Sequence, residues 1–332
     1  MTHDSHLHST GKNMVDLITA HVRAVLEGCQ EVYAAILMGS CSRGEESYYL
    51  DAEGQWQLLS DYEFTVITNS NMIPEALDEK LKDLNSFLKK KVKSPFFNLE
   101  WNYIWKKKLP MMDKRFINFE MAEARCMICG DETVFSLFPK IDVGNLNFAE
   151  LNSVVNHRLY HVLRDFTQIP EHQQKYLIAR NTLDILSVVL PYEGMLICSY
   201  QKRLEHFPKA LIGTKFSADI LNRLRNCLEM KKNYSSVLYE KLAVEEMLDT
   251  FIEDMRALHE FQKEKQNGAA FSVDRRRLVK AVLKLRKTEI RQVLARPDEE
   301  EKLYQDMMCS LENRDFIPGN YPQRMIALYQ YQ

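Results

Sequence analysis

The pattern of apolar and polar positions predicts an N-terminal region of alternating helices and strands. Residues 14–29 carry apolar side chains at helical spacing, and residues 74–93 do the same, beginning with a Pro that suits the first turn of a helix. Four short apolar runs predict strands, namely "VYAAILMG", "SDYEFTVIT", "SPFFNLEWNYIW" and "RCMICGD". "ETVFSLFP" adds a short helix. This half therefore predicts an α+β domain with a small mixed β-sheet.

From about residue 148 the pattern becomes helical almost throughout. Helical periodicity runs through residues 147–166, 172–194, 217–230, 235–265, 275–294 and 298–312, with a break at "GAAFSVD". The Gly and Asn of "DVGNLN" suit a boundary between the two regions. We therefore expect a disordered, His-rich lead-in at 1–13, an α+β domain at 14–145 and an all-α helical domain at 146–332.

Composition excludes some classes of protein. The 332 residues suffice for two cores, and Gly and Pro are scarce, at 11 and 10 residues, which argues against a turn-rich β architecture. A formal net charge of -2 provides no general attraction to nucleic acid or membrane. No apolar stretch approaches the roughly 20 residues of a membrane span, and the N-terminus has no secretory apolar core. The composition leaves the oligomeric state open.

The seven Cys form no disulfide framework, which predicts reduced thiols in a cytoplasmic protein. The one close pair is Cys126 and Cys129 in "RCMICGD". A zinc site would need a second such pair, which the sequence lacks. Buried, inert thiols are one interpretation of this pair, and a redox role is the other.

Three carboxylates occur on predicted strands, where they do not contribute to the stability of a sheet. Asp61 and Glu63 are two residues apart in "SDYEFTVIT", so they share one face of a strand while Tyr62 and Phe64 face the core. Glu100 lies among apolar and aromatic residues in "FNLEWNY". Adjacent carboxylates repel, and a hard cation such as Mg²⁺ removes that repulsion. If the strands are neighbours, Glu100 completes the cluster.

Gly39 and Ser40 follow the first apolar run directly. A strand that turns at Gly-Ser exposes backbone N–H groups that suit phosphate oxygens, and Arg43 adds a nearby positive charge. Together with the carboxylates, this turn predicts a site for a metal-bound nucleotide and phosphoryl or nucleotidyl transfer.

The series "ILMGSCSRGE", "SDYEFTVI" and "FNLEWNY" resembles the polymerase-β-like nucleotidyltransferase superfamily, and "ICGDETVFSLFP" is similar to a strand and turn of its small-molecule and antibiotic-type members. The resemblance covers the first 140 or so residues, and "IARNTLDIL" and "SYQKRLEHF" loosely resemble the helical C-terminal domains of those enzymes. It implies that Asp61, Glu63 and Glu100 bind Mg²⁺ or Mn²⁺ and act in catalysis. It also implies that Gly39 and Ser40 bind the NTP, and the charge of Arg43 makes that residue the third predicted nucleotide-binding residue.

The implied activity is transfer of an NMP from Mg-NTP to a hydroxyl or phosphate of a small-molecule acceptor, with release of pyrophosphate. The alternative is a protein-modifying (AMPylating) enzyme or a non-catalytic nucleotide-binding regulatory module of the same fold. The sequence departs from the family pattern in two ways, and neither departure removes a ligand. Gly39 and Asp61 are separated by 21 residues, with an inserted excursion at 45–59, and the second acid is Glu.

Other polar patterns have two interpretations each. His157 and His161 share a helix face and could bind zinc or pack at a domain junction. The Lys-rich runs at 88–93 and 105–110 and the basic run at 274–287 could bind a polyanion, steer the NTP or form solvated surfaces. Tyr200 and Arg203 could line the acceptor pocket or pack between helices. Asp184 could form an intrahelical pair with Arg180 or act as a base.

Overall fold

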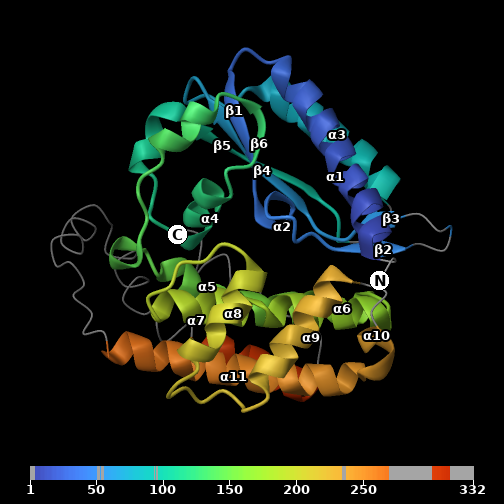
Figure 1. Ribbon diagram of the computed structural model, residues 1–332, viewed down its shortest axis with the longest axis vertical. Coiled ribbons are helices and arrows are strands. Elements are labelled where there is room, and N and C mark those ends of the chain that lie inside the picture. The colour runs from blue at the N-terminus through green and yellow to red at the C-terminus, as the bar shows by residue number, and fades with distance from the viewer. Residues whose placement is uncertain are drawn as a thin grey trace. The chain divides into compact units, whose positions relative to one another are not determined.

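The computed structural model shows a mixed α+β chain whose small sheet lies in the N-terminal part and whose later part is mostly helical (Figure 1). This confirms the predicted α+β class at that level. The residues that the structure describes are 4–50, 53, 56–92, 94, 96–233, 237–268 and 301–314.

The chain divides into two compact units that do not follow a single boundary. Unit 1 comprises Met1–Phe148, Met195–Arg203 and Leu228–Tyr239, and unit 2 comprises the remaining segments Ala149–Gly194, Leu204–Cys227 and Glu240–Gln332. The sequence predicted one boundary between residues 145 and 146. Two short segments from the helical half instead belong to the α+β unit, which a linear pattern cannot show because it contains no information on long-range contacts.

Unit 1 contains a four-stranded sheet in the order β5-β4-β1-β6. Strands β1 (Val32–Leu37), β4 (Tyr62–Thr68), β5 (Leu99–Trp105) and β6 (Met127–Gly130) correspond to the four predicted strands. β1 is antiparallel to β4 and β6, and β4 is parallel to β5, so the sheet is mixed.

One face of this sheet, called here the helix-covered face, is buried beneath α1 (Asp4–Glu27) and α3 (Glu75–Val92), which lie side by side in Figure 1. α1 buries Ile18, Val22 and Leu26 at helical spacing, as its pattern predicted. These side chains pack with strand residues such as Phe64. The prediction of a disordered lead-in at 1–13 was wrong in part, because α1 begins at Asp4. Extending an existing helix costs little per residue.

The opposite face, called here the mixed face, is covered over part of its area. The 3₁₀ segment η1 (Lys106–Met111), α4 (Phe116–Ala124) and the 3₁₀ segment η2 (Glu132–Leu137) provide the cover. They pack Leu109, Met121 and Val134 against residues of β1 and β4. The sequence predicted a helix at η2 but neither η1 nor α4.

The inserted excursion at 45–59 contains β2 (Tyr48–Leu50) and β3 (Trp56–Leu58), which pair antiparallel in a sheet of their own. Before it, Gly39 and Ser40 begin one short helix, α2 (Gly39–Ser42). A further 3₁₀ turn, η3 (Val143–Asn145), precedes the end of the first segment of unit 1.

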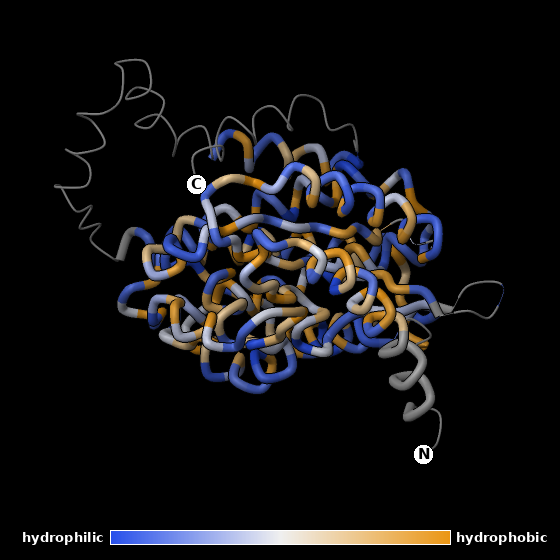
Figure 2. Tube along the Cα trace, turned by 90° about the horizontal axis from the view of Figure 1, so that it is seen from above, coloured by the Kyte–Doolittle hydropathy of each residue, from blue (hydrophilic) through white to orange (hydrophobic). Residues whose placement is uncertain are grey.

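The helical part begins with α5 (Ala149–Asp165), the 3₁₀ turn η4 (Phe166–Gln168), α6 (Glu171–Thr182) and α7 (Asp184–Tyr192). It continues with α8 (Tyr200–Ala210), α9 (Ile220–Lys232), α10 (Leu238–Lys241) and α11 (Val244–Gly268). Residues 301–312 are also helical, whereas the helix predicted at 275–294 lies outside the described residues. Hydrophilic and hydrophobic residues are interspersed along the described chain (Figure 2), and the helices bury their apolar positions.

Candidate functional site

Two of the three predicted carboxylates are direct neighbours in the sheet. Glu63 on β4 is in register with Glu100 on the parallel strand β5, so both side chains extend from the mixed face. Asp61 immediately precedes β4 and is two positions from Glu63. Tyr62 and Phe64 are fully buried on the helix-covered face, as the alternation predicted.

The mixed face changes character along its length. Away from the carboxylates it is apolar, because Ala34 and Ile36 of β1 and Ile67 of β4 are buried beneath η1, α4 and η2. Toward the start of β4 and β5 the same face carries Glu63 and Glu100, and Glu100 is exposed. The acidic pair therefore lies at the end of the mixed face that is more exposed than the apolar part beneath η1, α4 and η2.

The Gly-Ser turn lies directly against Glu63, one member of this acidic pair. Gly39 has a φ of +63°, and a Cβ built at this residue would stand 2.5 Å from Oε2 of Glu63. The backbone N–H of Met38 donates to the carbonyl of Glu63 at 2.8 Å, and the Cys41 thiol donates to the carbonyl of Asp61 at 3.5 Å. Glycine is needed here both for its backbone conformation and for the close approach of the carboxylate.

The donor set suits a hard divalent cation, since it consists of carboxylate oxygens that share one sheet face. The carboxylate of Glu100 accepts a hydrogen bond of 2.9 Å from the Asn98 amide, which orients one of its oxygens. Within the described ranges, no three His, Cys, Asp or Glu side chains already form a metal-binding group. The register of Glu63 with Glu100 and the chemistry of their carboxylates are compatible with the predicted cation.

Arg43 has partners other than those predicted. Its guanidinium is almost fully buried, with its Nε 3.0 Å from Glu45 and its Nη1 3.5 Å from Glu120. Burial acts to lower the pKa of Arg43, but the charges of Glu120, Tyr200 and Glu45 outweigh it and raise the pKa. The charge of Arg43 is therefore balanced inside unit 1 by carboxylates that sequence reasoning did not single out.

Arg203 and Tyr200 belong to the same buried cluster. Arg203 is 1% exposed, bonds to Glu120 and stacks over the Phe116 and Tyr200 rings, each at 4.9 Å. Of the two interpretations offered by the sequence, the structure gives Arg203 a packing role. No local signal marks this cluster, because its members are distant in sequence and resemble surface charges.

The other sequence candidates have structural partners. Arg158 forms an ion pair of 2.5 Å with Asp184, joining α5 to α7. Burial and the Arg158 charge lower the pKa of His157 to about 4 and contribute to lowering that of His161 to about 2, so both rings are neutral near pH 7. Cys126 and Cys129 are free thiols whose pKa values burial raises, which disfavours the reactive thiolate.

The Lys-rich runs differ in their surroundings. Lys89, Lys90 and Lys91 are exposed in the last turn of α3, where they complement the helix dipole. Lys106 instead lies 3.4 Å over the ring of Tyr33. The basic run at 274–287 lies outside the described residues.

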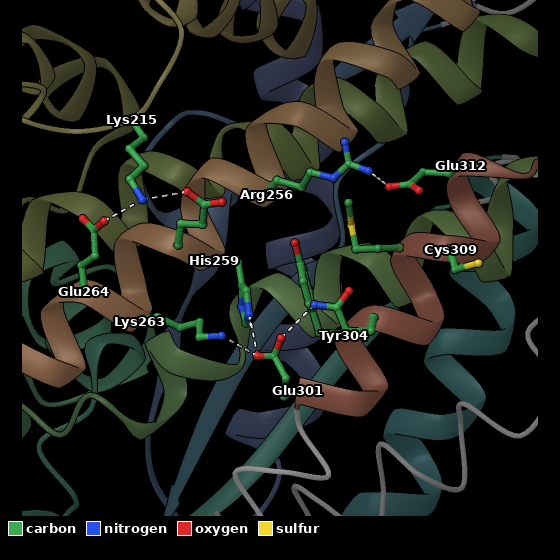
Figure 3. A pocket seen from close by; sticks show the side chains of 12 residues that line it. Lys215, Arg256, His259, Lys263, Glu264, Glu301, Tyr304, Cys309 and Glu312 are labelled. Atoms are coloured by element: carbon green, nitrogen blue, oxygen red, sulfur yellow. Dashed lines mark hydrogen bonds and ion pairs between the residues drawn. The ribbon is translucent and has the colours of Figure 1, made fainter.

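Unit 2 contains a polar cavity of about 520 Å³ between α11 and the helical residues 301–312 (Figure 3). Its charged side chains pair with one another. Lys215 contacts Glu260 and Glu264 at 3.1 and 2.9 Å, and Glu301 contacts His259 and Lys263. Because the lining charges are already paired, we interpret this cavity as a gap within a surface network of ion pairs and assign it no ligand.

No protein-family model matches the chain, and no curated protein sequence matches it. Across the part of the chain that the structure describes, every helix is too short or too polar to traverse a bilayer.

Proposed function

We propose that the protein is a nucleotidyltransferase of the polymerase-β-like type, acting on a magnesium-bound NTP and a small-molecule acceptor. The observation that supports this most directly is the register of Glu63 with Glu100, beside a Gly39 turn that touches the Glu63 carboxylate. Three separate stretches of sequence thus contribute to one small area of unit 1, in the order that the resemblance implies.

In the proposed reaction, the backbone of Gly39 and Ser40 holds the triphosphate, and Asp61, Glu63 and Glu100 hold Mg²⁺ or Mn²⁺. When bound, the cation would neutralise charge on the triphosphate, which would favour attack at the α-phosphorus. An acceptor oxygen forms a bond to the α-phosphorus while the bond from that phosphorus to the bridging oxygen breaks, and pyrophosphate leaves. For a hydroxyl acceptor, Glu100, the most exposed of the acidic pair, receives the proton.

The test is an Asp61→Asn variant compared with Asp83→Asn, a matched change on the exposed surface of α3. The wild type and Asp83→Asn are incubated with each α-labelled NTP, Mg²⁺ and a pool of hydroxyl and phosphate acceptors. We expect release of pyrophosphate and a labelled small molecule, with Asp61→Asn slower by at least about 10³-fold at unchanged melting temperature. Full activity in Asp61→Asn would contradict the mechanism.

The destination of the label distinguishes the proposal from its alternatives. Label on a small molecule supports the proposed activity, and label on a protein identifies a protein-modifying enzyme instead. A wild-type melting temperature that rises with NTP but needs no Mg²⁺, together with no transfer, would indicate a nucleotide-binding module.

A further inference from the structure

A buried charged cluster joins the Gly-Ser turn to the two returning segments of unit 1. It contains three cations and two carboxylates, with Tyr200 at its centre. Its charged members are Arg43, Glu45, Glu120, Arg203 and Lys231. The cations Arg43, Arg203 and Lys231 lie 5.6, 4.9 and 6.0 Å from the Tyr200 ring centre.

Glu45 contacts three separate segments of unit 1. Its backbone N–H donates to the Ser40 carbonyl at 3.0 Å, and its Oε2 accepts from Arg43 at 3.0 Å. Its Oε1 accepts from the Ser199 hydroxyl at 2.8 Å and from the Gln201 N–H at 3.3 Å. Its carbonyl accepts from the Lys231 ammonium. One residue thus connects the Gly-Ser turn to both returning segments.

Burial of Glu45 needs an explanation, because an ionised carboxylate loses its hydration inside a protein. Glu45 is only 4% exposed. Burial acts to raise the pKa of the carboxyl, but the Arg43 charge and the hydrogen bonds from Arg43 and Ser199 outweigh it and keep the pKa below its usual range. Such clusters seldom stabilise more than apolar packing would, yet they hold one geometry, and here that geometry is the turn after β1.

We propose that Glu45 is a positioning residue that fixes the Gly39–Ser42 turn for nucleotide binding, using Ser199 and Lys231 as anchors. The inference rests on the proposed function for its catalytic consequence. The positioning itself concerns only contacts within unit 1.

Two variants of different severity test the inference. Glu45→Gln keeps an acceptor for Ser199 but turns an amide N–H₂ toward the Arg43 guanidinium, so two donors face each other. Ser199→Ala removes only one of the bonds that anchor Glu45. Asp254→Asn is the matched control, since Asp254 is also buried and bonded to an arginine, Arg223, but lies in unit 2.

The first readout is hydrogen–deuterium exchange, which requires no activity. In the native turn the amides of Ser42, Arg43 and Glu45 donate to backbone carbonyls. We expect Glu45→Gln to raise exchange across residues 39–47 by about tenfold and Ser199→Ala by a few-fold, with no change in Asp254→Asn. Unchanged exchange in Glu45→Gln would overturn the inference, whatever the activity.

The second readout is steady-state transfer with each NTP and Mg²⁺. Because the turn would hold the triphosphate before and during reaction, we expect KM for the NTP to rise about tenfold in Glu45→Gln with little change in kcat. Faster exchange with unaltered KM would overturn the link to nucleotide binding. A wild type without any transfer would reject the proposed function, and the exchange measurement would still decide whether Glu45 fixes the turn.

Discussion

The two faces of the four-stranded sheet use the same strands for different purposes. On the helix-covered face, β1, β4 and β5 present side chains such as Leu37, Phe64 and Leu99 to α1 and α3, and these side chains are almost fully buried. On the mixed face the same strands present Glu63 and Glu100 next to apolar residues. Along each strand, a residue needed for stability is followed directly by one whose side chain lies on the other face and is available for chemistry.

The largest effect should come from the helix-covered face. Phe64 is 1% exposed and packs with Tyr62 and Trp101 at ring-centre distances of 6.1 and 6.4 Å. Phe64→Ala should lower the free energy of unfolding by about 3–5 kcal/mol, because it removes a large buried side chain and leaves a cavity. Urea denaturation measures this change. A loss below about 1 kcal/mol would contradict the assignment of this face as the core.

Two glycines with the same backbone conformation differ in their distance from the Glu63 carboxylate. Gly39 and Gly44 both have a φ of +63°, but a Cβ at Gly44 would meet no atom within 4 Å, whereas one at Gly39 would meet the Glu63 carboxylate. Both Ala variants should lose about 1 kcal/mol of stability through backbone strain, since the Glu63 side chain can move aside. Only Gly39→Ala should slow nucleotidyl transfer, by about 10²-fold, because the carboxylate is displaced.

Thermal melts and transfer rates of the two glycine variants provide the check. Equal activity of Gly39→Ala and Gly44→Ala would show that the contact between Gly39 and Glu63 has no part in the reaction.

The smallest effect concerns the repulsion between Glu63 and Glu100. In EDTA, Glu63→Gln should be more stable than the wild type by about 0.2–1 kcal/mol, because one of two in-register carboxylates becomes neutral. Added Mg²⁺ should reverse the order by stabilising only the wild type. Melting temperatures with and without Mg²⁺ measure the repulsion between the carboxylates and the stabilisation by the cation, with Asp83→Asn as the control. A wild type that is indifferent to Mg²⁺ would argue against a cation at this pair.

The parts of the fold that depend on local pattern could be predicted from the sequence. The alternation in "SDYEFTVIT" placed Tyr62 and Phe64 in the core and Glu63 on the opposite face, because strand side chains alternate strictly. That Glu100 would join Glu63 depended on a hypothesis about strand order, which the register supports. α4 escaped prediction because it is short and carries apolar side chains around most of its surface.

The charged cluster around Tyr200 could not be predicted. Glu45 and Arg43 resemble surface charges in "SRGEE", and nothing nearby in the sequence indicates Ser199 or Lys231 as partners. Buried ion pairs depend on tertiary contacts between distant segments, and periodicity contains no record of them. For this reason the sequence gives no sign of the ion pairs of Arg43 with Glu45 and Glu120.

The return of Met195–Arg203 and Leu228–Tyr239 to unit 1 limits how this molecule can be dissected. A fragment that stops at Phe148 would contain every proposed catalytic carboxylate but would lack Ser199, Tyr200, Arg203 and Lys231 of the charged cluster. Exchange of the helical half for that of another protein would remove the same side chains. Truncation and chimera designs should therefore keep Met195–Arg203 and Leu228–Tyr239 together with Met1–Phe148.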